Sequence, residues 1–173
     1  MILYLIMKQR VFIAINLPEE IKRKLADYQK KWPELPIRWT KKDNLHITLE
    51  FLGYLSKEKL ADVYQKTKEL ALKHKPFIIT LTKICYGPLS GTPKMVWAIG
   101  ERVVKEFGIS PHITLGRIRA WEWRKIEPEE RPEINEEINL SFEVNSIEIM
   151  ESVLKKSGPE YIILETCNLK HET

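Results

Sequence analysis

One short motif occurs twice in the chain, and it limits the possible folds more than any other feature of the sequence. Asn44-Leu-His-Ile-Thr-Leu49 recurs as Ser110-Pro-His-Ile-Thr-Leu115, which places two histidines 66 residues apart (112 minus 46). Both copies have the apolar, β-branched composition that is typical of strands. An internal repeat of this kind indicates two similar structural units. We therefore expect one bilobal domain over residues 1–173, with one His-x-Thr motif in each lobe.

Alternation along a strand separates the polar and the aliphatic side chains of each copy. Because successive side chains point to opposite faces, His46 shares one face with Thr48, and the aliphatic residues share the other. His112 and Thr114 are related in the same way. A single His-x-Thr is more often a half-exposed surface pair, but two nearly identical copies argue for a common site. If the two strands meet at a cleft, two imidazoles and two hydroxyls line it.

These residue types suit the opening of a cyclic phosphodiester, which needs a base for water and an acid for the departing ribose oxygen. An unperturbed histidine titrates at about pH 6.5, so a pair can hold one neutral and one protonated imidazole near neutrality. Threonine hydroxyls can donate hydrogen bonds to phosphoryl oxygens, where negative charge develops in the transition state. Arg117 falls on the opposite face from His112 by strict alternation, but a bulge at the strand end can redirect its guanidinium toward a phosphate.

The sequence predicts neither a metal site nor a cofactor. Cys85 and Cys167 are isolated, without Cys-x-x-Cys spacing, so we interpret them as buried free thiols. No His, Asp and Glu cluster has the spacing of a metal site, and no phosphate-binding loop or nucleotidyl-lysine motif indicates the use of ATP. The net charge of +4 suits a phosphate-bearing ligand and is far below that of a polybasic tail.

The start of the chain is apolar but lacks the marks of a secretion signal. Residues 1–7 have neither a basic n-region nor a small-residue cleavage site. No run approaches the roughly 18 apolar residues of a membrane helix. We expect a cytoplasmic protein that does not contact membranes, and a monomer. Met7 is an alternative start to Met1.

The remaining pattern predicts many strands and few helices, which is typical of an α+β fold with helices on the outer faces of sheets. Helices are expected from Leu17 to Pro33 and from the cap Ser56 to about Lys73. The inner stripe of the second helix is predicted to comprise Leu60, Val63, Thr67, Leu70 and Ala71. One or two helical turns are expected over 101–107, and a surface loop over 124–139. Strands are expected over 10–16, 37–40, 45–52 (ended by Gly53), 77–82, 94–99, 112–118, 142–152 and 161–169.

Together these segments resemble the two-histidine phosphoesterase superfamily, and within it the RNA 2′,3′-cyclic phosphodiesterase family, often labelled 2′-5′ RNA ligase. The resemblance covers nearly the whole chain. It rests on Arg10–Pro18, Arg38–Trp39, Asn44–Gly53, Val96–Ala98, Pro111–Arg119, Met150–Ser152 and Tyr161–Glu165.

The resemblance implies two antiparallel sheets facing a central cleft, and it implies a role for each motif residue. His46 would protonate the departing ribose oxygen and His112 would activate water, while Thr48 and Thr114 hold the phosphate and Arg117 lies near it. The implied reaction is metal-independent hydrolysis of RNA 2′,3′-cyclic phosphate ends to a 2′-phosphate. Other substrates stay open: 2′-5′ RNA linkages, which such enzymes join or cut, and small cyclic nucleotides. A protein that binds RNA ends without catalysis is a further alternative. His46 and His112 argue against it, because binding alone would not require two titratable groups.

One segment departs from the pattern of this family, in which a full helix lies between the Val-Trp-Ala strand and the second histidine motif. Here only 14 residues separate Trp97 from His112. A crossover to a parallel strand needs about a dozen residues or more, so we expect either a reduced helix or residues absent over 98–111. Aromatic side chains could stack on a nucleobase. Among them, Phe51 and Trp97 are expected in the core, Trp121 and Trp123 partly exposed, and Trp39 and Tyr86 stay candidates.

Overall fold

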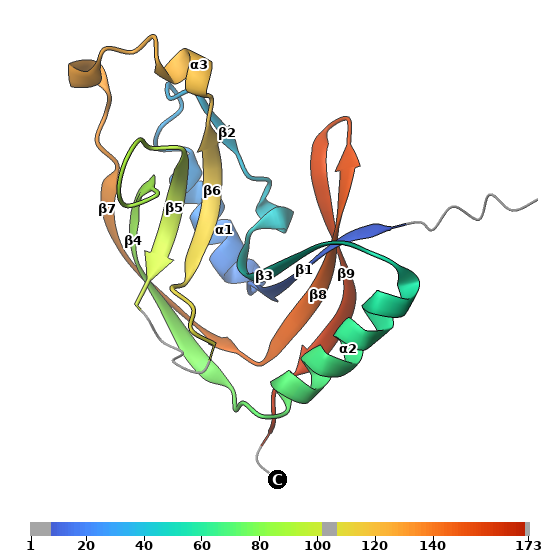
Figure 1. Ribbon diagram of the computed structural model, residues 1–173. Helices are drawn as coiled ribbons and strands as arrows, with labels where there is room; N and C mark the ends of the chain where they lie inside the picture. The colour runs from blue at the N-terminus through green and yellow to red at the C-terminus, as the bar shows by residue number, and fades with distance from the viewer. Residues whose placement is uncertain (1–7, 102–106, 172–173) are drawn as a thin grey trace, which may run out of the picture. The chain divides into compact units, whose positions relative to one another are not determined.

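The computed structural model describes residues 8–101 and 107–171, and within them it confirms the α+β class (Figure 1). Most of the helical turns predicted over 101–107, and the alternative starts, lie outside the described residues. The helices are α1 (Glu19–Gln29), α2 (Lys57–Ala71) and α3 (Ala120–Trp123), with 3-10 turns at Lys42–Asn44 and Pro128–Glu130. The strands are β1 (Gln9–Asn16), β2 (Ile37–Trp39), β3 (His46–Leu55), β4 (Phe77–Gly87), β5 (Met95–Gly100), β6 (His112–Ile118), β7 (Asn135–Val144), β8 (Ser146–Lys155) and β9 (Gly158–Asn168).

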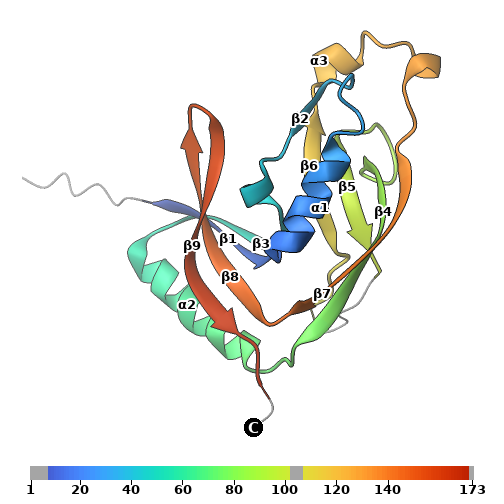
Figure 2. The same cartoon turned by 180° about the vertical axis from the view of Figure 1, so that it is seen from behind.

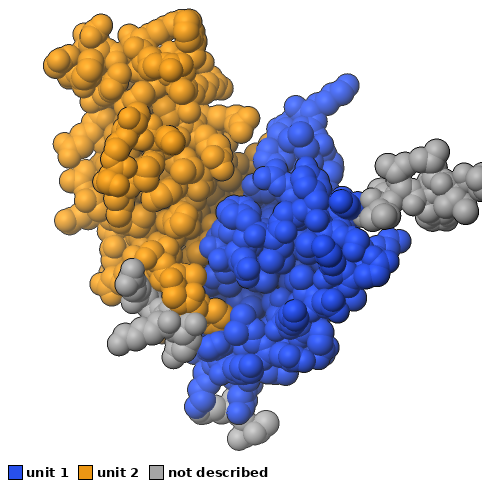
Figure 3. Space-filling model, in the orientation of Figure 1, with its two compact units in different colours: residues 1–16, 48–77, 143–173 blue, residues 17–47, 78–142 orange. Residues whose placement is uncertain are grey.

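The chain divides into two compact units, which Figure 3 shows in different colours. Unit 1 comprises residues 1–16, 48–77 and 143–173, and unit 2 comprises residues 17–47 and 78–142. One boundary falls inside β3, between Ile47 and Thr48, so both motif histidines belong to unit 2. The two lobes with one motif each, and two sheets facing a cleft, stay predictions.

The strands of unit 2 follow the order β7, β4, β5, β6. β5 pairs antiparallel with β4 and with β6, and β2 pairs antiparallel with β6. Figures 1 and 2, which view the molecule from opposite sides, both show α1 lying against the sheet of this unit. The sequence explains α1: Pro18 precedes it, Glu19 and Glu20 complement the helix dipole, and Ile21 and Leu25 recur at i and i+4 and are buried.

The antiparallel pairing of β5 with β6 corrects the expected crossover. Because neighbouring antiparallel strands need only a short connection, the brevity of the segment between Trp97 and His112 no longer calls for missing residues or a lost helix.

Unit 1 contains β1 hydrogen-bonded to β8, β8 paired with β9, and α2 packed against β8 and β9. The Ser56 hydroxyl accepts a hydrogen bond from the backbone N–H of Lys59 at 3.4 Å, which confirms the predicted cap. Leu60, Thr67 and Ala71 are buried as predicted. Leu70 was predicted in this stripe but is exposed, because each helical residue turns by about 100°, which carries Leu70 beyond the covered side.

Several strand boundaries also differ from those expected, since β4 ends at Gly87 and β9 begins at Gly158. β3 continues past Gly53, which adopts a positive φ of 72°, and ends at Leu55. β7 begins at Asn135, within the predicted loop, because Ile138, Phe142 and Val144 alternate onto a buried face. The glutamates and asparagines between them conceal this period-2 pattern in the sequence. The strand predicted over 142–152 is therefore the end of β7 and the start of β8.

Candidate active site

The pairing of β5 with β6 gathers the second motif on one face of unit 2. Trp97 pairs with Thr114, and Ile99 pairs with His112. Because directly paired residues share a face and alternate residues of a strand share a face, His112 and Thr114 lie on the same face as Trp97. The side chains between them are fully buried on the opposite face: Val96, Ala98, Ile113 and Leu115.

A β-bulge returns Arg117 to the face of His112. Val96 pairs with Gly116 whereas Trp97 pairs with Thr114, so Leu115 is an extra residue in β6. The bulge cancels one step of alternation, and Arg117 pairs with Met95, two residues before Trp97. The bulge thus redirects Arg117 to the face of His112, as the sequence allowed for a residue near the end of a strand. Gly116 fits here because a Cβ would lie 2.4 Å from Ile37 Cγ2 of β2.

Residues from outside β6 hold the bulge in place. The carbonyl of Leu115 accepts hydrogen bonds from the backbone N–H of Thr40 at 2.8 Å and from Gln29 Nε2 at 2.9 Å. Gln29 Nε2 also donates to the Thr40 carbonyl at 2.9 Å, and Thr40 Oγ1 donates to the Thr114 carbonyl at 2.9 Å. α1 thus helps to position Arg117 through Gln29. No sequence signal pointed to Gln29 or Thr40, because neither belongs to a motif.

The first motif is placed by the pairing of β3 with β6. Ile47 pairs with Ile113 in antiparallel register, and both are buried. His46 therefore lies opposite Thr114, on the face of His112. The two imidazoles are close enough for the charge of His112 to contribute to the lowered pKa of His46. Thr48 follows Ile47 along β3 as the first residue of a unit 1 segment, and by alternation it shares a face with His46.

The two imidazoles are tethered in the same way. Nδ1 of His46 lies 2.7 Å from the carbonyl oxygen of Asn44, and Nδ1 of His112 lies 3.2 Å from that of Ser110. A carbonyl can only accept, so each Nδ1 is assigned the proton, and Nε2 is the unprotonated nitrogen of the neutral ring. The repeated sequence therefore gives both imidazoles the same tether and the same tautomer.

Burial is the main cause that lowers the pKa of His46. The charges of Lys22 and His112 lower this pKa further, while the hydrogen bond to the Asn44 carbonyl opposes the shift. Lys22 is itself buried, and its Nζ donates to the carbonyl of Asp43 at 3.1 Å. The surroundings of His46 thus favour its neutral form in the free protein.

Trp97 contacts the second histidine directly. The ring centroids of Trp97 and His112 are 4.5 Å apart, at an interplanar angle of 36°. The same indole covers Gly87 of β4, where a Cβ would lie 2.3 Å from the ring. Its Nε1 is buried without an acceptor among the described residues. Trp97 was predicted as a core residue, with base stacking as the alternative, so its contact with His112 was missed.

The other aromatic predictions have mixed outcomes. Trp121 is 68% exposed, as expected. Trp123 was expected to be exposed but is buried, because its ring packs against Tyr86 and beneath the guanidinium of Arg131. Phe51, expected in the core, is 73% exposed.

Cys85 and Cys167 are buried free thiols, as predicted, and burial raises the pKa of each. In the described ranges, no three His, Cys, Asp or Glu side chains gather as a metal site. No helix within these ranges is long and apolar enough to cross a membrane.

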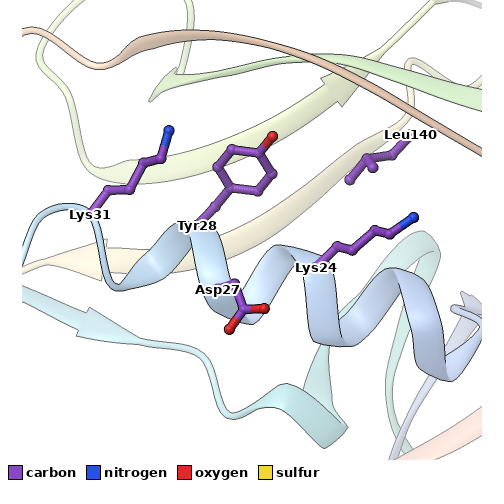
Figure 4. A pocket seen from close by; sticks show the side chains of 5 residues that line it. All are labelled: Lys24, Asp27, Tyr28, Lys31 and Leu140. Carbon is purple, nitrogen blue, oxygen red and sulfur yellow. The ribbon is translucent and has the colours of Figure 1, made fainter.

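A cavity of about 480 Å³ lies between α1 and Leu140 of β7, away from the motif residues (Figure 4). Its lining comprises Lys24, Asp27, Tyr28, Lys31 and Leu140. Both lysines already have carboxylate partners, since Lys24 pairs with Glu20 and Lys31 with Glu136. None of the predicted site residues lines this cavity.

Comparison with known proteins gives a consistent result. Over 95% of its length the chain is similar to the crystal structure of TT0787 of Thermus thermophilus, with 28% identity, full coverage of that chain and a TM-score of 0.78. The structure of Escherichia coli LigT complexed with phosphate is 27% identical, with coverage of 95% of this chain and 99% of that one and a TM-score of 0.70. The RNA 2′,3′-cyclic phosphodiesterase of Methanocaldococcus jannaschii is 30% identical over 90% of this chain and 98% of its own length.

These similarities define the protein as an enzyme of the phosphoesterase class. The sequence pattern described as LigT like Phosphoesterase matches residues 15–97, which include the first motif. The chain belongs to the LigT-like phosphoesterase family.

Proposed function

We propose that this enzyme hydrolyses RNA 2′,3′-cyclic phosphate ends to 2′-phosphates by paired-histidine acid–base catalysis, without a metal ion. The observation that carries the proposal is the pair of imidazoles on one face of unit 2, each tied through Nδ1 to a backbone carbonyl. Thr114 and Arg117 lie on the same face. The name of the M. jannaschii relative supports this choice of substrate.

In this mechanism the two Nε2 atoms have opposite tasks. The neutral Nε2 of His112 accepts a proton from water as the water oxygen bonds to phosphorus. The bond between phosphorus and the ribose 3′ oxygen breaks, and the protonated Nε2 of His46 donates its proton to that oxygen. The product carries a 2′-phosphate, and proton exchange with solvent restores both histidines. Thr48 and Thr114 donate hydrogen bonds to the non-bridging oxygens, and Arg117 offsets their negative charge.

The lowered pKa of His46 couples its protonation to substrate binding. In the free protein, burial and the charge of Lys22 disfavour the imidazolium that the acid role requires. An anionic cyclic phosphate beside the ring has the opposite effect, because a nearby opposite charge stabilises the protonated form. His46 is therefore expected to take up its proton as the substrate binds, so that the acid forms where it is needed.

The test is the turnover of an oligonucleotide with a 2′,3′-cyclic phosphate end by His46→Ala and His112→Ala. Each substitution should lower kcat by at least about 10²-fold, the effect of losing an acid or a base. His171→Ala serves as the matched control, because this exposed histidine belongs to neither motif. Near-parental turnover in either motif variant would remove that histidine from the mechanism. Faster turnover of a 2′-5′ linkage or of a small cyclic nucleotide would instead reassign the substrate.

A further inference from the structure

Two arginines face each other across the pairing of β2 with β6. Arg38 pairs directly with Arg117, and Trp39 pairs with Gly116. Directly opposed residues have Cβ atoms about 5 Å apart and share a face. Arg38 therefore lies beside Arg117, on the face that carries Thr114 and His112. Both arginines are exposed.

Among the residues that the structure describes, this pair has no counter-charge of its own. Within the described ranges, no hydrogen bond or ion pair satisfies the guanidinium of Arg38 or of Arg117. Arg119, two residues further along the chain, differs because it pairs with Glu122 at 3.5 Å. Like charges placed directly opposite each other destabilise a sheet. Two opposed arginines without a carboxylate partner therefore point to an anionic ligand on this face.

The number of positive charges exceeds what the reacting group requires. A cyclic phosphodiester carries one negative charge, which Arg117 and a histidinium already match. Arg117 lies three residues beyond Thr114, a distance of at most about 10 Å at roughly 3.3 Å per strand residue. Arg38 beside it is therefore placed for a second anion further along this face. In an RNA strand, the next anion is the phosphodiester that precedes the terminal nucleotide.

We infer that Arg38 binds the phosphodiester that joins the cyclic terminal nucleotide to the one before it. The enzyme would then prefer the ends of RNA chains over cyclic mononucleotides, which lack this group. The inference rests on the proposed function, since it assumes that the cyclic phosphate binds beside His46 and His112. It adds a residue that selects the class of substrate and takes no part in the bond changes.

The experiment compares kcat/KM of the parent and of Arg38→Ala on three substrates. These are 2′,3′-cyclic AMP, a diribonucleotide with a 2′,3′-cyclic phosphate end, and the same dinucleotide with a neutral methylphosphonate linkage. The parent should favour the charged dinucleotide over the neutral one by roughly 10-fold to 100-fold, the effect of a charge-assisted hydrogen bond. Arg38→Ala should abolish this preference and leave cyclic AMP turnover unchanged. Arg23→Ala, which removes an exposed arginine from α1, should retain the preference.

Two results would overturn the inference. An equal loss on all three substrates would show that Arg38 acts on the reacting phosphate or on folding, and Arg38→Lys with a thermal melt would separate these two causes. An undiminished preference in Arg38→Ala would show that another group binds the linkage.

Calorimetry can test the inference independently of the proposed function, because it measures binding of the two 2′-phosphate dinucleotide products without any turnover. If the parent turns over no cyclic phosphate, the proposed function fails, while Arg38-dependent discrimination between the two linkages still supports the phosphodiester site. For a single-stranded oligonucleotide with the same 2′-phosphate end, loss of one phosphate contact should also reduce the slope of log affinity against log salt by about 0.7. An unchanged slope would contradict the site.

Discussion

Gly87 offers a way to perturb His112 from outside both histidine motifs, through the ring of Trp97. A Cβ at this position would lie 2.3 Å from the Trp97 ring, whereas ordinary contact begins at 3.4 Å. In Gly87→Ala the ring must therefore move by about 1.1 Å, the difference between these values. Because the same ring packs against the imidazole of His112 at 4.5 Å, the displacement should disturb the proposed base.

Two magnitudes follow for Gly87→Ala. Overpacking of this kind costs about 1–3 kcal/mol of unfolding free energy, which urea denaturation measures. A misplacement of about 1 Å near a reacting group can cost on the order of 10²-fold in rate, which kcat/KM on a cyclic phosphate end measures. The variant should therefore lose both stability and activity.

A double-mutant cycle with Trp97→Leu tests the route of this effect. Leucine leaves room for the added methyl group, so Gly87→Ala should cost less than about 0.5 kcal/mol in that background, and the two substitutions should be strongly non-additive. Parental stability and activity in Gly87→Ala would refute the reasoning. So would equal losses with and without the indole, because the effect would then not pass through Trp97.

The remaining predictions concern the surroundings of the histidines and the bulge in β6. The profile of kcat/KM against pH should be bell-shaped, and the limb that reports His46 should lie at lower pH than an unperturbed histidine would give, because the pKa of His46 is lowered. Lys22→Met removes a charge that lowers this pKa, so the limb that reports His46 should move to higher pH; an unmoved limb, or an unmoved His46 NMR titration, would contradict the assignment. The unfolding free energy should fall as pH decreases from 7 to 5, since the unfolded chain then binds more protons at His46, and His46→Gln should weaken this dependence. Gln29→Leu removes two hydrogen bonds that hold the bulge. It should lower the unfolding free energy by roughly 1–3 kcal/mol and should also lower kcat/KM. A loss of stability without a loss of activity would show that the bulge does not contribute to catalysis.

The parts of the fold that the sequence predicts well are those where the residue pattern and the burial agree. The strand expected over 112–118 is observed with these bounds, because aliphatic and polar residues alternate with a fully buried face. β7 was missed over 135–139, because a half-exposed strand whose outer positions are glutamate and asparagine reads as a polar loop. Local composition cannot distinguish a half-exposed strand of this kind from a polar loop.

Prediction of the candidate active site from the sequence meets a similar limit. The repeat predicts which residues share a face of a strand, and β5 and β6 place His112 and Thr114 accordingly. The bulge at Leu115, the cross-strand position of Arg38 and the packing of Trp97 on His112 depend on the register between strands. Register is set by pairings between residues far apart in the chain, so no spacing within one segment reveals it.

The central claim is tested most directly by the product that forms from an oligonucleotide ending in a 2′,3′-cyclic phosphate, incubated with the purified protein in EDTA. Phosphatase treatment and mass spectrometry identify which ribose oxygen keeps the phosphate. We expect complete conversion to a 2′-phosphate, undiminished by the chelator and lost in His112→Ala. A 3′-phosphate product, inactivation by EDTA that added metal reverses, or no conversion at all would contradict the account.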